Sequence, residues 1–335
     1  MDQLRNIAQA ILDPGKELAD LIPEAQALRD LFEQRANFQI DHATGVGEGE
    51  TRLASGLAIS PTLAAMCIRE LFRTAAFIRG LGNAIRDARH PHRPVRVLYA
   101  GCGPYALLAL PLMTVFRKEQ ALFTLLDIHR ECLDDAMKLI DSFGLAGHVD
   151  GCFCADATTF RIPAEAMPDV IVSETMAVAL HNEPQVSIER NLLSQAPGAK
   201  MVPQRVSVEA CVLRPGKEHV FMPAGFTGEF PAPERDRIHL GNLFDLDADS
   251  VRGWEGIEGD RLPAGRVRIP RPLDGRVPHL LTRIVVYGET TLQDYDCSLT
   301  VPRRLGREIE GGEELQFHYQ LGNDPELRYE KTGGG

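Results

Sequence analysis

The sequence predicts an α/β protein with a doubly wound parallel sheet, a helical region before the sheet and a β-rich region after it. Three observations predict this fold. Residues 1–90 show mostly helical apolar periodicity, and residues 91–200 alternate short apolar strands with helical segments. In residues 201–335 apolar residues recur at every second position, with many Gly and Pro between the runs. The first alternation is typical of parallel sheets with right-handed crossovers, and the second of β-strands, so we expect residues 201–335 to form a β-rich, barrel-like sub-domain.

In the region 1–90 we expect a helical lid over a pocket. Apolar residues recur at helical spacing over residues 4–11, and Ser60 and Pro61 suit the N-cap and first position of a later helix. That helix is expected to carry Arg73. Between the helices, residues 41–50 place three glycines among acidic residues and are predicted to form a mobile loop.

The remaining elements follow from runs of strand length and helical periodicity. In the middle region we predict strands at 95–100, 121–126, 149–154 and 168–173, and helices at 107–116 and 130–143. In the last region we predict strands at 206–213, 281–287, 298–301 and 315–319.

Charge restricts the class of partner. The chain of 335 residues has 36 Lys and Arg against 47 Asp and Glu, a net charge of −11. An acidic surface repels a phosphate backbone, so we expect no nucleic-acid partner. Small molecules, in particular basic amines and guanidines, fit this charge better.

Cysteine usage and hydropathy predict a cytoplasmic protein. The seven Cys include no C-x-x-C pair, and the sequence shows no signal peptide. No stretch of 18 apolar residues occurs, so we expect neither a membrane span nor export.

The most informative motif directly follows the predicted strand at 95–100. Gly101 and Gly103 lie in Ala-Gly-Cys-Gly-Pro-Tyr105, before a predicted helix. Glycines at this turn let a ligand approach the backbone, and the helix N-terminus offers free N–H groups. Asp127 ends the second strand 26 residues after Gly101, where a carboxylate can accept both hydroxyls of a ribose. Asp156, after the third strand, can accept a hydrogen bond from an adenine amino group.

With these motifs the chain resembles the class I S-adenosylmethionine-dependent methyltransferases, and more narrowly the protein arginine methyltransferases, over roughly residues 63–213. The resemblance implies a Rossmann-like domain that binds S-adenosyl-L-methionine. It assigns cofactor binding to the residues of the glycine turn and strand ends, and to an arginine of the lid helix that pairs with the cofactor's carboxylate. These residues are Arg73, Gly101, Gly103, Tyr105, Asp127, Ile128, Asp156, Ala157 and Glu174.

The same resemblance assigns the reaction to a loop with two glutamates. Glu174 and Glu183 are nine residues apart, as in the family, where the pair clamps a guanidinium. Both are therefore catalytic candidates, and with Met176 and His181 they are the candidates for substrate binding. The family often forms dimers through an inserted helical arm, so a homodimer is an option, with residues 225–260 as the candidate insert.

The sequence also departs from the family. Tyr105 stands where a third glycine is expected, the lid helix lacks the family's tyrosine pair, and no Thr-His-Trp sequence occurs. The motifs for the cofactor are thus more complete than those for an arginine substrate.

Simpler interpretations of the same residues stay open. The glycine turn also suits a nicotinamide-binding or ligand-free α/β domain, and Asp127 a helix cap. Glu174 and Glu183 also suit a solvated pair, and Arg73 a surface ion pair. No His or Cys spacing predicts a metal site.

Three functions follow. The first is N-methyl transfer to a small amine or guanidine metabolite, with Glu174 and Glu183 orienting the acceptor and one of them taking its proton. The second is cyclisation of S-adenosylmethionine itself to azetidine-2-carboxylate, with release of 5′-methylthioadenosine, as in the azetidine-2-carboxylate synthases. The third is a non-catalytic module that binds S-adenosylmethionine.

Overall fold

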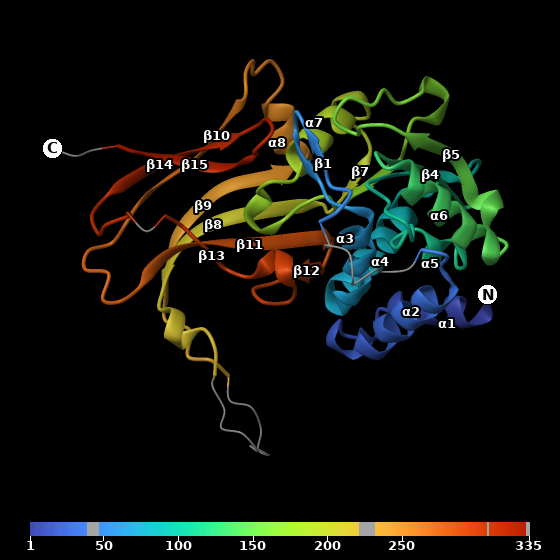
Figure 1. Cartoon of the computed structure of the whole chain (residues 1–335), viewed down its shortest axis with the longest axis horizontal. Helices are drawn as coiled ribbons and strands as arrows, with labels where there is room; N and C mark the ends of the chain where they lie inside the picture. The colour runs from blue at the N-terminus through green and yellow to red at the C-terminus, as the bar shows by residue number, and fades with distance from the viewer. Residues whose placement is uncertain (39–46, 221–231, 307, 333–335) are drawn as a thin grey trace.

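The computed structural model describes residues 1–38, 47–220, 232–306 and 308–332. In Figure 1 a parallel α/β half and an antiparallel β half lie side by side along the long axis. The N-terminus belongs to the α/β half, and the C-terminus lies at the far end of the antiparallel half. Most of the loop expected at 41–50, and part of the insert considered at 225–260, lie outside the described residues.

The parallel sheet confirms the predicted doubly wound fold. Its five strands are all parallel to their neighbours, and they lie in the order β5 (Val149–Cys154), β4 (Ala121–Asp127), β3 (Val95–Ala100), β6 (Val170–Ser173) and β7 (Lys200–Val202). The chain runs outward from β3 to β5, then returns to the other side of β3. Connections therefore diverge between β3 and β6, and the carboxyl ends of these strands border a crevice.

Helices cover both faces of this sheet. Helix α6 (Arg130–Ser142) packs on β4 and β5, and α7 (Gln185–Gln195) packs on β6. Right-handed crossovers on opposite sides of β3 put these two helices on opposite faces. The helix expected at 107–116 is wrong in length, since only α5 (Leu110–Met113) is α-helical. The left-handed φ of 44° at Ala106 interrupts the segment before α5.

The described residues of the N-terminal region form four α-helices, two short 3-10 helices and a β-hairpin. The α-helices are α1 (Asp2–Ile11), α2 (Ile22–Arg35), α3 (Pro61–Met66) and α4 (Leu71–Asp87), and the hairpin pairs β1 (Thr51–Leu53) with β2 (Gly56–Ala58). The Ser60 hydroxyl accepts a hydrogen bond from Leu63 N at 3.1 Å, which confirms the expected cap. The helix does not run unbroken to Arg73, because Glu70 has non-helical dihedrals and separates α3 from α4.

The C-terminal region is β-rich, as predicted, and its strands pair antiparallel. One sheet has the order β12 (Thr290–Leu292), β11 (Val277–Tyr287), β8 (Arg205–Leu213) and β9 (Arg237–Asp247), with β13 (Arg303–Arg304) beside β11, and a second has the order β10 (Arg261–Arg268), β14 (Glu314–Gln320) and β15 (Glu326–Lys331). The short helix α8 (Ala248–Gly253) follows β9. The strand expected at 298–301 is wrong. Ser298–Thr300 form a 3-10 helix, because the Thr300 hydroxyl accepts a hydrogen bond from Cys297 N and turns the chain.

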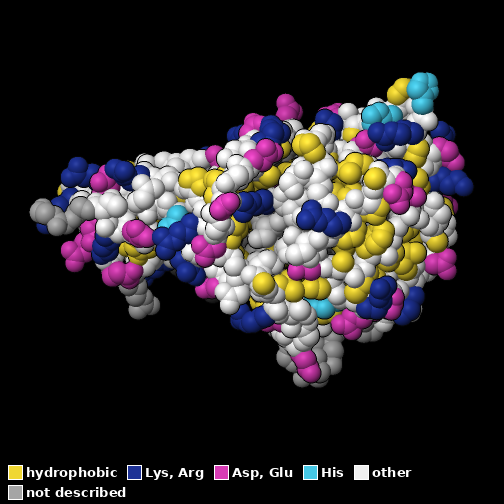
Figure 2. Space-filling model, turned by 90° about the horizontal axis from the view of Figure 1, so that it is seen from above, with side chains coloured by type: hydrophobic (Ala, Val, Ile, Leu, Met, Phe, Trp, Pro, Cys, Tyr) yellow, Lys and Arg dark blue, Asp and Glu magenta, His cyan; other side chains and the backbone are white. Residues whose placement is uncertain are grey.

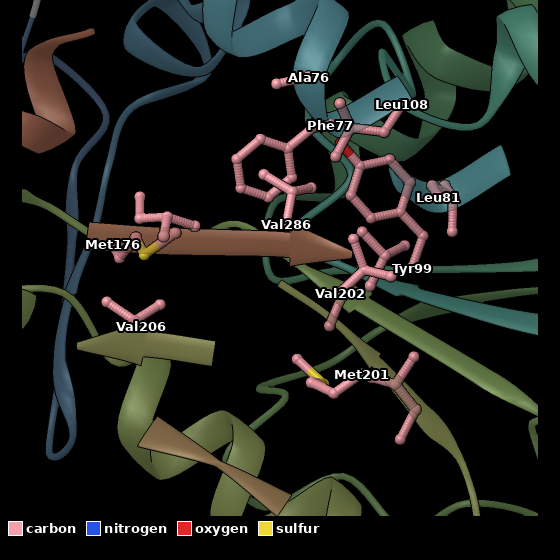
Figure 3. Packing of buried hydrophobic residues seen from close by; sticks show 14 of the residues in the cluster. Ala76, Phe77, Leu81, Tyr99, Leu108, Met176, Met201, Val202, Val206 and Val286 are labelled. Atoms are coloured by element: carbon pink, nitrogen blue, oxygen red, sulfur yellow. The ribbon is translucent and has the colours of Figure 1, made fainter. Parts of the chain in front are cut away.

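Helix α4 joins the two halves. It packs against β7 of the parallel sheet and against β11 of the antiparallel one. Figure 3 shows Phe77 of α4 next to Val286 of β11, and Leu81 of α4 next to Tyr99; these residues and Val202 belong to one buried cluster. The two sheets therefore share one hydrophobic core through this helix.

Polar groups cover much of the outer surface. Seen from above, charged side chains are spread over the molecule, while apolar ones gather over the α/β half (Figure 2). The large apolar side chains that are exposed are dispersed along the chain: Met1, Met167, Val220, Ile238 and Val301. No helix among the described residues is long and apolar enough to cross a membrane.

The close packing of α4 on β11 makes Gly80→Ala a test of this core. A Cβ at Gly80 would lie 2.5 Å from Cγ1 of Val286, which is fully buried. We expect a lower melting temperature, because overpacking costs about 1–3 kcal/mol and better helix propensity returns at most about 1 kcal/mol. Thermal unfolding measures the change. Gly253→Ala in α8 is the control, since its Cβ would meet nothing within 4 Å. Equal melting temperatures for Gly80→Ala and wild type would contradict the close contact.

Candidate functional site

One pocket lies at the crevice where the sheet connections diverge. Residues from the carboxyl ends of β3, β4, β5 and β6 line it, together with the β1–β2 hairpin and the start of α7. Its lining includes these residues expected from the sequence: Gly101, Gly103, Tyr105, Asp127, Ile128, Asp156, Ala157, Glu174 and Glu183. A ligand site at this position is the rule for doubly wound sheets.

The glycine turn has the conformation that its sequence predicts. Gly101 and Gly103 have φ of 74° and 61°, which only glycine adopts without strain. A Cβ at Gly101 would lie 2.4 Å from the Thr175 side chain, so the turn after β3 directly touches the turn after β6. Tyr105 takes the place of a third glycine and lines the pocket, with its hydroxyl 3.5 Å from Phe38 O.

Asp127 holds this turn from the neighbouring strand. One of its carboxylate oxygens accepts a hydrogen bond from Gly103 N and the other from His129 N, both at 2.9 Å. Burial raises the pKa of Asp127, while these two backbone donors act in the opposite direction. Each oxygen has a second lone pair, so the carboxylate can still accept a hydroxyl of a ligand from the pocket.

Asp156 is held in a similar way after β5. Its Oδ1 accepts hydrogen bonds from the N and Oγ1 of Thr158, at 2.8 and 2.7 Å. Thr158 also accepts a hydrogen bond from the Ser55 hydroxyl at 3.3 Å, which connects this loop to the tip of the β1–β2 hairpin. No described contact engages Asp156 Oδ2, which leaves this atom for a donor on a ligand.

Arg73 lies behind Glu174 rather than among the residues that line the pocket. The two side chains form an ion pair and both are nearly buried. Burial raises the pKa of Glu174, while the Arg73 guanidinium lowers it. The second carboxylate oxygen, Oε1, is buried and has no hydrogen-bond partner among the described residues. Glu174 therefore keeps one oxygen available for a donor in the pocket.

A network in α7 fixes the backbone on both sides of Glu174. The Gln185 side-chain carbonyl accepts hydrogen bonds from the N and Oγ1 of Thr175, and its amide donates to Ser173 O. The same amide donates to Glu189 at 2.7 Å. Glu189 is fully buried, and burial raises its pKa to about 8.

Glu183 reaches the pocket from the loop between β6 and α7. Burial raises its pKa to about 8, and the neighbouring carboxylate of Glu174 acts in the same direction. Two other substrate candidates from this loop do not line the pocket. Met176 packs in the apolar core near Val206 (Figure 3), and His181 bonds through Nδ1 to Val178 O.

The β1–β2 hairpin is the part of the site that the sequence analysis missed. Leu53 and Leu57 line the pocket, and Leu57 N donates a hydrogen bond to Asn182 O at 2.8 Å. Gly56, with φ of 136°, packs so closely that a Cβ would lie 2.9 Å from the same carbonyl. The Ser55-Gly56 dipeptide between short apolar runs is a turn signal that could have indicated the hairpin.

Three potential metal ligands also meet in the pocket. Ligand atoms of Asp127, His129 and Cys132 all lie within 4.8 Å of one another. Burial raises the pKa of the Cys132 thiol well above neutral pH, so it stays protonated and is a poor ligand. His129 Nε2 lies 3.0 Å from Thr51 Oγ1, which ties it to the hairpin. We interpret Asp127, His129 and Cys132 as polar residues that line the pocket.

Comparison with known proteins adds one structural likeness. No protein-family model and no curated protein matches the sequence. Among solved structures, the chain is similar to the Trypanosoma brucei PRMT1 enzyme-prozyme heterotetrameric complex with AdoHcy. The identity is 14% and the TM-score 0.48, over 80% of this chain and 92% of that chain. A structural similarity of this degree does not identify the ligand, reaction or assembly of this chain.

Proposed function

We propose that the protein binds S-adenosylmethionine in this pocket and directs alkyl transfer from its sulfonium to an amine nitrogen. The observation that carries the proposal is the meeting of the glycine turn, Asp127, Glu174 and Glu183 in one pocket. An acid at the tip of the second strand is the usual partner of a ribose in doubly wound folds. Glu174 and Glu183 line the same pocket as the glycine turn, and we assign them to the reactive end of the ligand.

The donor set of the pocket fits this ligand. The free lone pairs of Asp127 suit the ribose hydroxyls, and the open oxygen of Asp156 suits the adenine amino group. The buried, unpartnered Oε1 of Glu174 suits an ammonium or amine donor. The residues suited to adenosine and those suited to an amine thus line the same cavity.

In this reaction the protein aligns the acceptor and removes its proton. S-adenosylmethionine supplies a carbon bound to a sulfonium, which is already a good leaving group. The N–C bond forms as the C–S bond breaks, and the electron pair of the broken bond stays on sulfur. Glu183 accepts the proton from the amine, Glu174 orients it, and the hairpin limits access of water.

The pKa of Glu183 favours an amine over a guanidine as the acceptor. A carboxylate with a pKa of about 8 is well matched to an α-amino group, whose pKa is about 8. A guanidinium, with a pKa above about 12, holds its proton too firmly for such a base. The net charge of −11 also favours a small cationic acceptor.

The Arg73–Glu174 ion pair favours intramolecular cyclisation as a second candidate. A guanidinium of the chain already occupies one of the two carboxylates that would clamp an arginine substrate. The hairpin docks on the Glu183 loop, and residues of both line the pocket. The acceptor would then be the α-amine of S-adenosylmethionine, which displaces the thioether from its own γ-carbon.

Incubation of the purified protein with S-adenosylmethionine alone separates the two candidates. Mass spectrometry of the nucleoside products is the measurement. Release of 5′-methylthioadenosine with azetidine-2-carboxylate supports cyclisation. S-adenosylhomocysteine formed only after an amine is added supports methyl transfer to a second substrate. If the protein neither binds nor consumes S-adenosylmethionine, with or without amines, the proposed function is wrong.

Glu183→Gln tests the base. In the wild type, Glu183 is protonated below pH 8 and becomes a proton acceptor above it, so the rate should rise with pH through about 8. We expect the variant to lose about a hundredfold or more in kcat and to lose this rise, because a glutamine cannot accept the proton. Single-turnover rates from pH 6 to 10 give both quantities.

Glu131→Gln is the matched control for this substitution. Glu131 is exposed on α6 and lies outside the pocket lining, so its removal should leave rate and pH profile unchanged. A Glu183→Gln variant with the rate and pH profile of the wild type would show that another group takes the proton.

A further inference from the structure

The loop that carries Glu183 is held in an unfavourable backbone conformation. Ala179, Leu180 and Asn182 have φ of 56°, 56° and 67°, in the left-handed region. Residues with a Cβ rarely adopt this region, and they persist there only where surrounding contacts impose it. Something outside the loop must therefore hold these three residues.

The antiparallel half supplies the contacts. The Tyr319 hydroxyl on β14 donates a hydrogen bond to Leu180 O at 2.6 Å. Ala179 N donates to the hydroxyl of Thr282, on β11, at 2.9 Å. Between β14 and β15, Pro325 O accepts from Asn182 N at 2.7 Å. Each of the three strained residues thus has one hydrogen bond to a different segment of the antiparallel half.

The Tyr319 side chain both packs in the core and bonds to the loop through its hydroxyl. It is fully buried, and its ring stacks on Phe244 with centroids 4.9 Å apart. The hydroxyl is not needed for this packing, because a phenylalanine ring would bury the same apolar surface. Its single described bond is the one to Leu180 O, two residues before the turn into Glu183. Burial raises the pKa of Tyr319, so the hydroxyl stays a donor.

We infer that Tyr319 and Thr282 are positioning residues that hold Glu183 at the pocket through the strained loop. The inference rests on the proposed function, since it assigns Glu183 the role of proton acceptor. It gives the antiparallel half a role in a reaction at the carboxyl edge of the parallel sheet.

Loss of either hydroxyl should let the loop relax. Glu183 would then move away from the charged groups that act on its pKa, namely the largely buried Glu174 and Arg73 and the exposed Glu50. More water would reach the carboxylate, and its proton affinity would fall toward that of an exposed glutamate. The adenosine part should still bind, because the hydrogen bond between Gly103 N and Asp127 is separate from the contacts of Tyr319 and Thr282 with the loop.

Tyr319→Phe tests the inference with a change of one hydroxyl group. We expect kcat to fall by about tenfold to a hundredfold, the pH midpoint of the rate to move below that of the wild type, and the affinity for S-adenosylhomocysteine to stay within about twofold. Tyr329→Phe is the matched control. Its hydroxyl bonds to Glu308 on the outside of the same sheet, so rate and pH midpoint should be those of the wild type.

Two substitutions of Thr282 provide a second, independent test. Thr282→Val removes the acceptor for Ala179 N and should lower kcat, whereas Thr282→Ser retains a hydroxyl and should restore it. Wild-type kcat and pH midpoint in Tyr319→Phe, or equal rates in Thr282→Val and Thr282→Ser, would overturn the inference while the wild type is active. A wild type that does not act on S-adenosylmethionine would instead refute the proposed function.

Discussion

The buried ion pair between Arg73 and Glu174 is the interaction on which the site depends. It connects α4, which joins the two halves of the core, to the end of β6, where the sheet connections diverge. Removing one partner of a buried pair costs about 3–5 kcal/mol, because the other charge is left uncompensated. The pair uses one oxygen of Glu174 and leaves the other without a hydrogen-bond partner among the described residues.

Each half of the molecule contributes a different part of the site. The parallel sheet provides the rigid part, in which Asp127 and the glycine turn hold each other through a backbone hydrogen bond. The antiparallel half holds the loop of Glu183, whose conformation is unfavourable in isolation. The hairpin bridges the two, because it bonds to the Asp156 loop through Ser55 and to the Glu183 loop through Leu57.

Those features that depend on local sequence could be predicted. The strands β3 and β4, the turn at Gly101 and the acid Asp127 follow from short-range patterns, and the structure brings them together. Features set by distant contacts could not. Nothing near Arg73 in the sequence indicates its partner 101 residues away, and nothing near Tyr319 indicates its bond to the Glu183 loop.

Very short helices and strands could not be predicted from the sequence either. A three-residue strand such as β1 has too few positions to show a period, so the β1–β2 hairpin was expected to be part of a helical lid. In Ser298–Thr300, apolar and β-branched residues suggested a strand, but a side-chain cap turned the chain instead. Met176 and His181 are close to the glutamates in sequence, yet the loop turns them away from the pocket.

We propose that the pocket where the sheet connections diverge recognises an adenosine group through Asp127. Isothermal titration of S-adenosylhomocysteine into the wild type, Asp127→Asn and Asp134→Asn tests it most directly. Asp134 is exposed on α6 and outside the pocket lining. We expect one-to-one binding by the wild type and by Asp134→Asn, and an affinity at least about tenfold weaker in Asp127→Asn, a difference of about 1.4 kcal/mol. No binding by the wild type, or equal affinity in all three proteins, would contradict it.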